Sequence, residues 1–417
     1  MNLRTVNKKF RQEVLVDSKG EYNSTTVIVC RFVVLCAKAS AGLFLSSFLW
    51  PISLYRPIEI WLMKLGPDKA SHFIEGIESH LRRSQFEGGH KTIRIVLWPQ
   101  KFPNESLAKL YRNHCYFVGP RQRFLAKIFP FILWRVVVKP HSVDSKSLEV
   151  AKTRCLGKPS VAFSGQDLMM GSELKTSLFR GLSREFVLLG FASQSYRRLR
   201  DQKYHPKDDL FSQIPNPSNY LKAVEKLQLD SIDVVRQGLN LENNFDLLEA
   251  WLIVPDTTKY PNGFVDVWLA SNCKFLVSAC SGNHWFGLPF NKPVVITDSY
   301  LPVVTPLNTA IVLFQLPWNI VEERFEDFCW MLKNPRWCFD KEKLGSIYKI
   351  VHNSPEQIVD VVDEQLQRLN GKWLETDEDM ELQQRFRRLV WGNDSDSFTL
   401  PKVGAKFLRE HKNLLLG

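Results

Sequence analysis

The chain has 417 residues, 44% of them hydrophobic and 24% charged, a balance that is ordinary for folded globular proteins and excludes an intrinsically disordered chain. The length favours two domains over one. Lys and Arg number 55 against 44 Asp and Glu, and the net charge of +11 suits a membrane surface or phosphorylated substrates, whereas the absence of zinc-finger, RRM and KH signatures argues against nucleic acid as a partner.

Residues 1–87 are expected to contain a basic lead followed by a helical, apolar segment that associates with a membrane. The lead, residues 1–25, is polar and basic and does not resemble a cleavable signal peptide. The charge-free run of residues 39–55 falls short of the roughly 20 residues that span a bilayer, and Pro51 interrupts it. We therefore expect an interfacial or re-entrant helix, with a buried core helix and a true span as the alternatives.

Residues 88–180 are expected to form the first of two Rossmann-like domains, after an amphipathic and exposed helix over residues 67–85. Its elements are predicted as strands over residues 93–98, 115–118 and 135–138 and a helix over residues 104–112. Asn104 is a suitable N-cap for that helix. Residues 121–134 favour a core helix over a second interfacial surface, and residues 155–185 lack clear periodicity, which predicts a lid or linker.

Residues 181–417 are expected to form the second Rossmann-like domain. Its first elements are predicted as strands over residues 186–191 and 232–235 with a helix over residues 217–227 between them. Later helices are predicted over residues 318–332, 355–370, 376–390 and 403–414. A polar, basic loop follows the first strand, at the position where open α/β sheets bind ligands. Its candidate binding residues are Ser193, Ser195, Tyr196, Arg197 and Arg198.

The stretch over residues 264–302 predicts a βαβ unit. A short helix precedes a buried strand over residues 274–277, which leads into a small-residue turn ending at Gly282 and then into an apparent helix. A second strand over residues 293–296 ends at Asp298 and its polar neighbours. A small-residue turn before a helix lets backbone N–H groups approach a phosphate closely. The turn therefore predicts a ligand site at the carboxyl ends of these strands.

Several short motifs, in a fixed order along the chain, resemble one known family. They are the segments Asn104 to Arg112, Asn219-Tyr220, Val234 to Gly238, Asp266 to Gly282, Lys292 to Val295 and Lys406 to Leu408. Together they resemble the bacterial glycosyltransferases of surface-polysaccharide gene clusters, over roughly residues 88–415. The resemblance implies a GT-B-like α/β fold of two Rossmann-like domains. It also implies transfer of a sugar from a nucleotide-activated donor to a cell-surface glycan or a lipid-linked acceptor.

One departure from the family pattern stands at the end of the first strand of the second domain. The family places a His-x-Arg motif there, and this chain has Gly190-Phe191-Ala192. An Arg at that point would pair with donor phosphates. The departure favours the alternative, a non-catalytic glycan- or nucleotide-binding relative that acts as a scaffold in polysaccharide assembly. A nucleic-acid binder, supported only by charge, is a third and weaker reading.

The donor-binding residues implied by this resemblance surround the strand ends. They are Arg236, Gly238, Ser278, Ser281, Gly282 and Asp298, together with the loop residues of the first strand. Arg236 would neutralise a diphosphate, unless it forms only a surface ion pair. Asp298 would accept a hydrogen bond from a ribose or sugar hydroxyl, unless it only forms the turn. His284 and Trp285 would flank a base or sugar, with a packed aromatic pair as the simpler expectation.

No metal-ligand cluster has suitable spacing, so we expect neither a metal ion nor another cofactor, and helix N-termini and basic side chains would stabilise the leaving diphosphate instead. An inverting transfer would need a general base, for which Asp167, Glu173 and Asp266 are the candidates. Gly165, Gln166 and residues 169–171 are a further candidate segment, expected near the cleft between the two domains. Eight scattered cysteines without a CxxC pair indicate a reducing compartment. We expect a cytoplasmic protein, peripherally attached to the inner membrane.

Overall fold

The computed structural model describes a large part of the chain, in two compact units. The described residues are 58–62, 70–86, 93–97, 102–118, 136–140, 148–180, 184–190, 216–238, 251–279, 282–300, 309–335, 337–340, 342–393 and 401–415, with single positions at 33, 36, 37, 40 and 47. One unit comprises residues 1–68, 88–103 and 111–141. The other comprises residues 69–87, 104–110 and 142–417. The chain therefore passes between the units several times before residue 142.

The first unit contains a four-stranded parallel sheet in the order β3-β2-β1-β4. Its strands are β1 (Ile58–Leu62), β2 (Ile93–Leu97), β3 (Tyr116–Val118) and β4 (Val136–Pro140), with a 3-10 turn, η3 (Tyr111–Asn113), before β3. The strands predicted from residue 93 onward are confirmed. The sequence did not predict β1, whose register places Ile58 between Ile93 and Val136. Its residues were assigned to the apolar N-terminal segment, but they pair on both sides within this sheet.

The remainder of the predicted membrane segment lies almost entirely outside the described residues. Only positions 40 and 47 of the charge-free run are described. Residues 121–134, predicted as a core helix, also lie outside them. Within the part of the chain that the structure describes, no helix is both long enough and apolar enough to cross a membrane.

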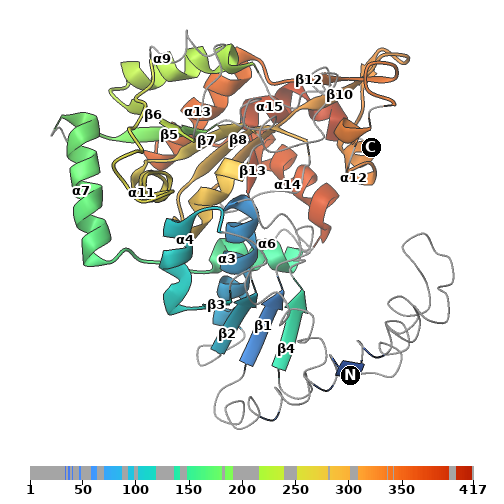
Figure 1. The fold of residues 1–417 in the computed structure, drawn as a ribbon. Coiled ribbons are helices and arrows are strands. Elements are labelled where there is room, and N and C mark those ends of the chain that lie inside the picture. Colours follow the sequence, from blue (N-terminus) through green and yellow to red (C-terminus); the bar gives the residue numbers. More distant parts are fainter. Residues whose placement is uncertain are drawn as a thin grey trace. The chain divides into compact units, whose positions relative to one another are not determined.

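The second unit is built on a six-stranded parallel sheet in the order β13-β9-β8-β7-β5-β6 (Figure 1). Its strands are β5 (Phe186–Gly190), β6 (Asp233–Gln237), β7 (Leu276–Ala279), β8 (Val294–Ser299), β9 (Ile311–Phe314) and β13 (Lys402–Val403). The side chains of β5, β7, β8 and β9 are all buried, as expected for strands covered on both faces. The predicted βαβ unit is confirmed, because β7 and β8 pair in parallel.

The direction in which the strands are added reverses between β5 and β7. From β5 the chain adds β6 on one side, and then β7, β8, β9 and β13 in turn on the other. In open α/β sheets such a switch point opens a crevice outside the carboxyl ends of the two central strands, and ligands bind there. The topology therefore places the expected ligand site of this unit at the ends of β5 and β7.

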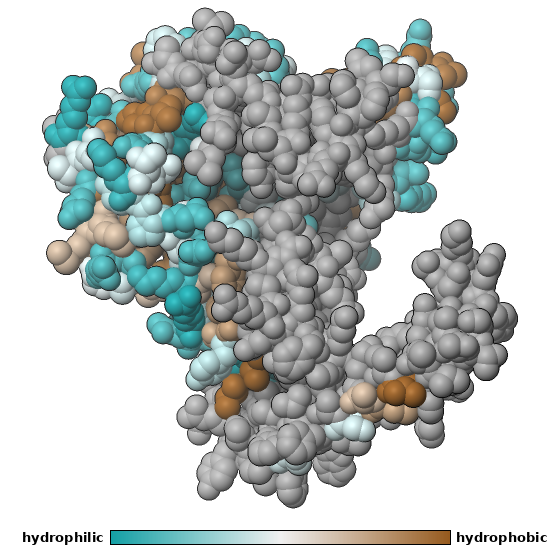
Figure 2. All heavy atoms as spheres, in the orientation of Figure 1, coloured by the Kyte–Doolittle hydropathy of each residue, from teal (hydrophilic) through white to brown (hydrophobic). Residues whose placement is uncertain are grey.

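Helices cover both faces of this sheet. They are α3 (Ala70–Phe86), α4 (Glu105–Leu110), α6 (Leu148–Leu156), α7 (Gly165–Phe179), α9 (Leu221–Leu229), α11 (Phe264–Asn272), α12 (Phe328–Lys333), α13 (Pro355–Leu369), α14 (Asp377–Trp391) and α15 (Ala405–Glu410). Shorter 3-10 segments are η7 (Pro217–Tyr220), η9 (Gly282–Phe290), η10 (Trp337–Phe339) and η12 (Lys412–Leu415). Helix α13 packs on β8, β9 and α9, whereas α11 packs with η9, α4 and α7 (Figure 1). On the visible face, the surface over α7 and α9 is mainly hydrophilic (Figure 2).

One local prediction is wrong, and the structure adds detail to two others. Residues 318–332 do not form one helix. An antiparallel sheet and the short α12 occupy this region instead. The strands of the sheet are β10 (Leu316–Asn319) and β11 (Arg324–Phe325), before α12, and β12 (Tyr348–Val351), after it. Residues 155–185, which were predicted to contain a lid or linker, hold the end of α6 and all of α7, joined by a non-helical connection over residues 157–164. The apparent helix after Gly282 is the 3-10 segment η9, which contains Pro289.

Helix α3, predicted to be exposed, is instead central to the second unit. Phe73, Ile74 and Ile77 are fully buried, and so is Arg82. The Arg82 guanidinium donates to Glu78 at 2.8 Å on its own helix, and to backbone carbonyls of α6, η9 and Gly157. Burial of a charge is tolerated when it is paired and its donors are satisfied. Glu78 and Arg82 of α3 therefore mark a buried junction and not a solvent-facing side.

Candidate functional site

Three strands bring polar or small residues to the switch point at its carboxyl edge. Gly190, the last residue of β5, lies opposite Gln237 of β6 and Ser278 of β7. A Cβ atom on Gly190 would lie 2.7 Å from Nδ2 of Asn283 and 3.2 Å from Oε1 of Gln237. Both distances are shorter than ordinary contacts, so only glycine lets Asn283 approach the end of β5. Gly190 therefore serves a close packing contact at the end of β5.

The turn after β7 meets the beginning of α3. A Cβ atom on Gly282 would lie 2.5 Å from Oγ of Ser71, in the first turn of α3. The sequence predicted that this turn lets a phosphate approach closely, whereas the neighbour that the structure shows at Gly282 is the Ser71 side chain. Ser281, the other residue predicted to bind phosphate in this turn, lies outside the described residues. A helix start and a small-residue turn thus adjoin each other at the edge where a ligand is expected.

Arg236, Gly238 and Asp266, predicted separately, lie together at the end of β6. The Gly238 N–H donates to Oδ1 of Asp266 at 3.3 Å, and Gly238 has φ of 99°, which favours glycine. Burial raises the pKa of Asp266, and the Gly238 N–H and the Arg236 charge oppose that rise. Arg236 is itself buried, as the penultimate residue of β6. The cluster offers one guanidinium and one carboxylate beside the switch point.

Asp298 lies at the end of β8 and is held from several directions. Its side chain is fully buried, and its Oδ1 accepts from the backbone N–H of Asn353 at 2.9 Å. The Asp298 N–H donates in return to Oδ1 of Asn353 at 2.7 Å. Nδ1 of His352 lies 3.0 Å from the same carboxylate oxygen. One oxygen of Asp298 is therefore engaged in holding the segment that precedes α13.

His352 and Asn353 were not among the residues predicted for the site. In the structure they lie between β12 and helix α13, which begins with the capping box of Ser354, whereas the sequence pattern predicts only a helix from residue 355. Their contact with Asp298 joins residues 54 and 55 positions apart, which no local pattern encodes. A histidine just before a helix cap, in a chain whose strand ends form the site, is the signal that could have identified them.

The other general-base candidates are placed differently. Asp167 lies in the first turn of α7, where it completes a capping box with Ser164 and bonds to Lys109 at 2.9 Å. Burial alone would raise the pKa of Asp167, but the hydrogen bonds from Lys109 and Ser164 outweigh it and hold the pKa below its ordinary value. Glu173 is exposed on the same helix. The geometry gives Asp167 a structural role and brings neither residue to the switch point.

Several predicted contact residues are packed in the core. The Ser278 hydroxyl donates to the carbonyl of Ala279 at 3.0 Å within β7. His284 and Trp285 are buried in η9, with ring centroids 5.2 Å apart. The Arg154 guanidinium lies 4.8 Å above the Trp285 ring, a cation–π contact that ties η9 to α6. His284 and Trp285 therefore form a packed aromatic pair, which is the simpler of the two expectations for them.

The segment from Gly165 to Gly171 forms the first half of α7. Gly171 packs against the Trp268 indole of α11, and Met169 is largely exposed. The loop residues Ser193, Ser195, Tyr196, Arg197 and Arg198 lie outside the described residues. Among the residues that are described, no group of three His, Cys, Asp or Glu side chains could hold a metal ion.

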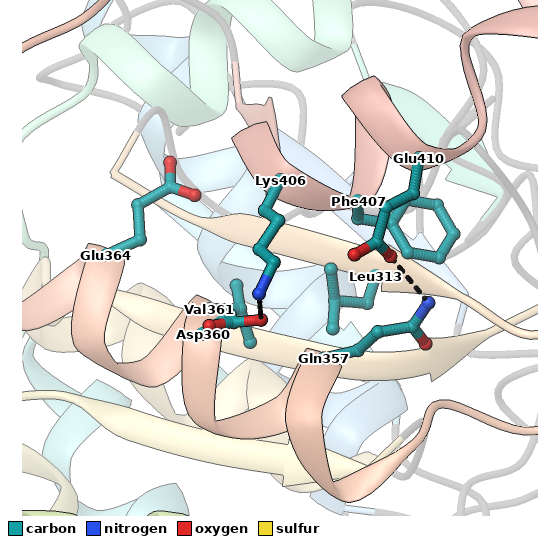
Figure 3. A pocket seen from close by; sticks show the side chains of 9 residues that line it. Leu313, Gln357, Asp360, Val361, Glu364, Lys406, Phe407 and Glu410 are labelled. Atoms are coloured by element: carbon teal, nitrogen blue, oxygen red, sulfur yellow. Dashed lines mark hydrogen bonds and ion pairs between the residues drawn. The ribbon is translucent and has the colours of Figure 1, made fainter.

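A shallow crevice lies between α13 and α15, away from the predicted residues (Figure 3). Its polar side chains are paired with one another. Lys406 forms an ion pair with Asp360 at 2.6 Å, and Gln357 donates to Glu410 at 3.2 Å. Glu364 accepts from the Ala405 N–H at 2.8 Å, at the start of α15. These contacts join two helices, so we assign the crevice a structural role.

Comparison with known proteins gives structural similarity alone. No family model matches the chain, and no curated protein does. Among solved structures, a glycosyl transferase family 9 protein from Veillonella parvula is 13% identical with a TM-score of 0.47, over 75% of this chain and 98% of that one. Escherichia coli ADP-heptose LPS heptosyltransferase II is 14% identical with a TM-score of 0.39, over 62% and 90%.

The E. coli heptosyltransferase WaaC, solved with ADP-2-deoxy-2-fluoro heptose, is 13% identical with a TM-score of 0.34, over 61% of this chain and 92% of that one. These similar structures are glycosyltransferases. Their TM-scores lie below 0.5, so every assignment for the present chain depends on its own residues and geometry.

Proposed function

We propose that this chain is a metal-independent glycosyltransferase of the GT-B type. It would move a sugar from a nucleotide-activated donor to a hydroxyl of a cell-surface glycan or a lipid-linked acceptor. The observation that carries this proposal is the convergence of Arg236, Gly282 and Asp298 on the carboxyl edge of one parallel sheet, around its switch point. These three residues come from separate segments of the sequence and belong to β6, the turn after β7, and β8, respectively.

The chemistry required at this edge is stabilisation of a leaving diphosphate. The turn at Gly282 lies between the two flanking groups, because β7 is separated from β6 by one strand and is paired directly with β8. Neighbouring strands are about 4.8 Å apart, so a diphosphate above β7 is within the reach of an arginine side chain on β6. Arg236 would pair with phosphate oxygens, and backbone N–H groups at the turn would complete the contact.

The second candidate function is a non-catalytic nucleotide- or glycan-binding relative that acts as a scaffold. Gly190 favours it, because the end of β5 has no side chain and is closed over by Asn283. Such a protein would bind a donor or glycan without turnover. The two candidates differ in whether sugar transfer follows binding.

Calorimetric titration of the full-length protein with UDP, GDP, CDP, dTDP and ADP, with and without magnesium, tests the proposal. Saturable binding of one nucleotide that does not require magnesium is the expected result. Sugar transfer, or hydrolysis of the matching nucleotide sugar, then separates the enzyme from the scaffold. A folded protein that binds none of the five nucleotides would contradict the enzyme proposal.

Membrane attachment through the apolar N-terminal segment is part of the same proposal, with the cytoplasmic face of the inner membrane as the site of action. The lipid-linked acceptor would lie at that surface. Deleting residues 1–55 leaves β1 intact, since that strand begins at Ile58. The shortened protein is expected to stop co-sedimenting with anionic lipid vesicles, whereas the full chain binds them. Equal binding by both forms would show that another surface makes the contact.

A further inference from the structure

The end of β8 holds a carboxylate–imidazole pair. Oδ1 of Asp298 lies 3.0 Å from Nδ1 of His352, which follows β12 in the chain and precedes α13. The carboxylate is fully buried, whereas the imidazole remains 25% exposed. A buried acid thus holds a histidine that reaches the surface of the carboxyl edge. This arrangement, with a buried carboxylate and a partly exposed imidazole, is the one that orients a histidine for proton transfer.

The acid is fixed in position before any ligand is present. Asp298 has φ of 53°, in the left-handed region that few residues other than glycine adopt. Two hydrogen bonds with Asn353 hold it there, one given and one accepted. The Asn353 side chain in turn donates to the carbonyl of Phe314 at 3.0 Å, at the end of β9. Uncommon backbone geometry that the surroundings hold in place is concentrated at functional sites.

The hydrogen bond to Asp298 determines what the ring can do. An ionised carboxylate only accepts, so Nδ1 must carry the proton. In the neutral ring Nε2 then has a lone pair and can accept a proton from a ligand hydroxyl. When Nε2 takes that proton, the ring becomes a cation beside the Asp298 carboxylate, which stabilises it. Asp298 would therefore set both the tautomer and the orientation of His352 without touching the ligand.

The surroundings of Asp298 contain further buried polar groups. Oδ2 of Asp298 has no hydrogen-bond partner among the described residues, and neither does the side-chain amide of Gln315. Gln315 is fully buried, and its backbone N–H donates to the carbonyl of Ser299, the residue after Asp298. Buried polar groups without partners are costly and uncommon in native proteins. Asp298 and Gln315 thus form a buried polar region at the adjacent ends of β8 and β9.

We propose that His352 is the general base of the transfer and that Asp298 is its positioning residue. This inference rests on the proposed function. The acceptor hydroxyl oxygen attacks the anomeric carbon of the donor sugar, and the bond from that carbon to the diphosphate oxygen breaks. The hydroxyl proton passes to Nε2 of His352, and the nucleoside diphosphate leaves with the bonding electron pair. The displacement is single, so the anomeric configuration is inverted.

The position of the pair agrees with this role. Strand β8 pairs directly with β7, with Ala279 opposite Thr297, so Asp298 is one strand away from the turn proposed to hold the diphosphate. Arg236 lies on the other side, two strands from β7. The diphosphate would therefore lie between a cation and a base. Asp266, the remaining carboxylate candidate, lies beside Arg236 and accepts from Gly238, which suits positioning of the cation better than proton transfer.

The test measures nucleotide binding and donor hydrolysis separately in the full-length protein. The probes are UDP-glucose, GDP-mannose, dTDP-glucose, CDP-glucose and ADP-glucose, with water as the acceptor and release of nucleoside diphosphate as the readout. In His352→Asn the amide can still donate to Asp298, but the Nε2 edge is removed. We expect the nucleotide Kd to stay within about twofold while kcat falls by about 100-fold or more, because general bases typically contribute that much.

Asp298→Asn is expected to lower kcat in the same way, because it removes the carboxylate that positions His352. The variant should keep the local structure, since asparagine tolerates φ above zero and can still accept from Asn353. His352→Ala removes the ring, and added imidazole is expected to restore part of its turnover. His114→Asn replaces an exposed histidine of the first unit and serves as the control, with unchanged kcat. Thermal unfolding of each variant verifies the fold.

Two results would overturn the role of His352 and leave the proposed function standing. In the first, His352→Asn keeps kcat within about threefold of the wild-type value. In the second, His352→Asn loses nucleotide binding in parallel with turnover. The first would make His352 dispensable, and the second would make it a ligand-binding group. A wild-type protein that neither binds nucleotides nor hydrolyses any probe overturns the proposed function, and the assignment with it. That failure is seen in the wild type and is thus distinct from the other two.

Discussion

Gly282 and Ser71 are in direct contact: a Cβ atom on the glycine would lie 2.5 Å from the serine Oγ and 2.6 Å from its Cβ. The first residue belongs to the turn after β7 and the second to the start of α3, more than two hundred positions earlier in the chain. The close contact fixes α3 against the edge where the donor is proposed to bind. Both the stability of the unit and the shape of that edge depend on the missing side chain.

Gly282→Ala is expected to lower the free energy of unfolding by about 1–3 kcal/mol, the usual effect of forcing atoms into a packed contact. It should also weaken nucleotide binding, because the turn must move away from α3. Ser71→Gly removes the opposing side chain and costs up to about 1 kcal/mol through helix propensity. In the double variant the two losses should not add, which chemical denaturation of all four proteins measures. Strict additivity would show that the two residues do not press on each other.

Local sequence patterns predicted the parts of the fold that local interactions determine. Asn104 was expected to cap its helix, and its Oδ1 accepts from the Leu107 N–H at 2.8 Å. Strands β5, β6, β7 and β8 followed from short apolar runs, whereas β9 and β13 of the same sheet were not predicted. Helix α3 was misplaced at the surface, since periodicity finds an apolar face but does not show that Arg82 on the other face is satisfied by carbonyls far along the chain.

The same distinction between local patterns and contacts of distant segments applies to the candidate site. Arg236 and Gly282 were found because each follows an apolar strand, and strand ends carry ligands in such sheets. Asp298 was found for that reason too, but its partner was not. The distance between Asp298 and His352 is set by how β12 and α13 fold back onto β8, and nothing within either segment specifies it. Pairings between distant segments are the part of a site that one sequence leaves out.

A second glycine is expected to control the packing of α7. A Cβ atom on Gly171 would lie 1.7 Å from Nε1 of Trp268, a distance at which one of the two helices must move. Gly171→Ala should therefore destabilise the second unit by about 1–3 kcal/mol or more. Gly165→Ala is the matched control, because it lies on the same helix and a Cβ there meets nothing within 4 Å. Equal urea midpoints for the two variants would mean that α7 is not held against Trp268.

Asp167 is expected to make stability depend on pH. Its pKa is lowered in the folded protein, so its contribution is complete above the ordinary pKa of about 3.9 and is lost as the pH falls through the lower, folded value. Asp167→Asn removes the charge that Lys109 meets. The variant should be less stable than wild type by about 1 kcal/mol at pH 7, and this difference should shrink as the pH falls below about 4.

Urea unfolding of both proteins across this pH range measures the difference. Glu173→Gln, on the exposed face of the same helix, is the control and is expected to change stability by less than about 0.5 kcal/mol. A difference between Asp167→Asn and wild type that stays constant down to pH 2 would contradict the role of the charge. It would leave the neutral capping hydrogen bonds with Ser164 as the whole contribution of this residue.

Arg236 is the residue on which donor binding most depends in the proposed site. A charge-assisted hydrogen bond contributes about 1.5–3 kcal/mol, so Arg236→Ala should weaken nucleotide binding by about 10- to 100-fold. Arg236→Lys keeps the charge but loses the planar fork, and an intermediate affinity is expected. The same titration that identifies the nucleotide measures these changes.

The control for Arg236 is Arg184, which precedes β5 and contacts the opposite end of β6. Arg184 is exposed and pairs with Asp233, the first residue of β6, at 3.2 Å. Arg184→Ala removes an equal charge from the same unit, and only Arg236→Ala removes it from the carboxyl edge. If binding depended on overall positive charge alone, both variants would weaken it equally relative to the wild type. Added salt would then abolish that loss of affinity. A loss confined to Arg236→Ala would place the nucleotide at the carboxyl end of the sheet.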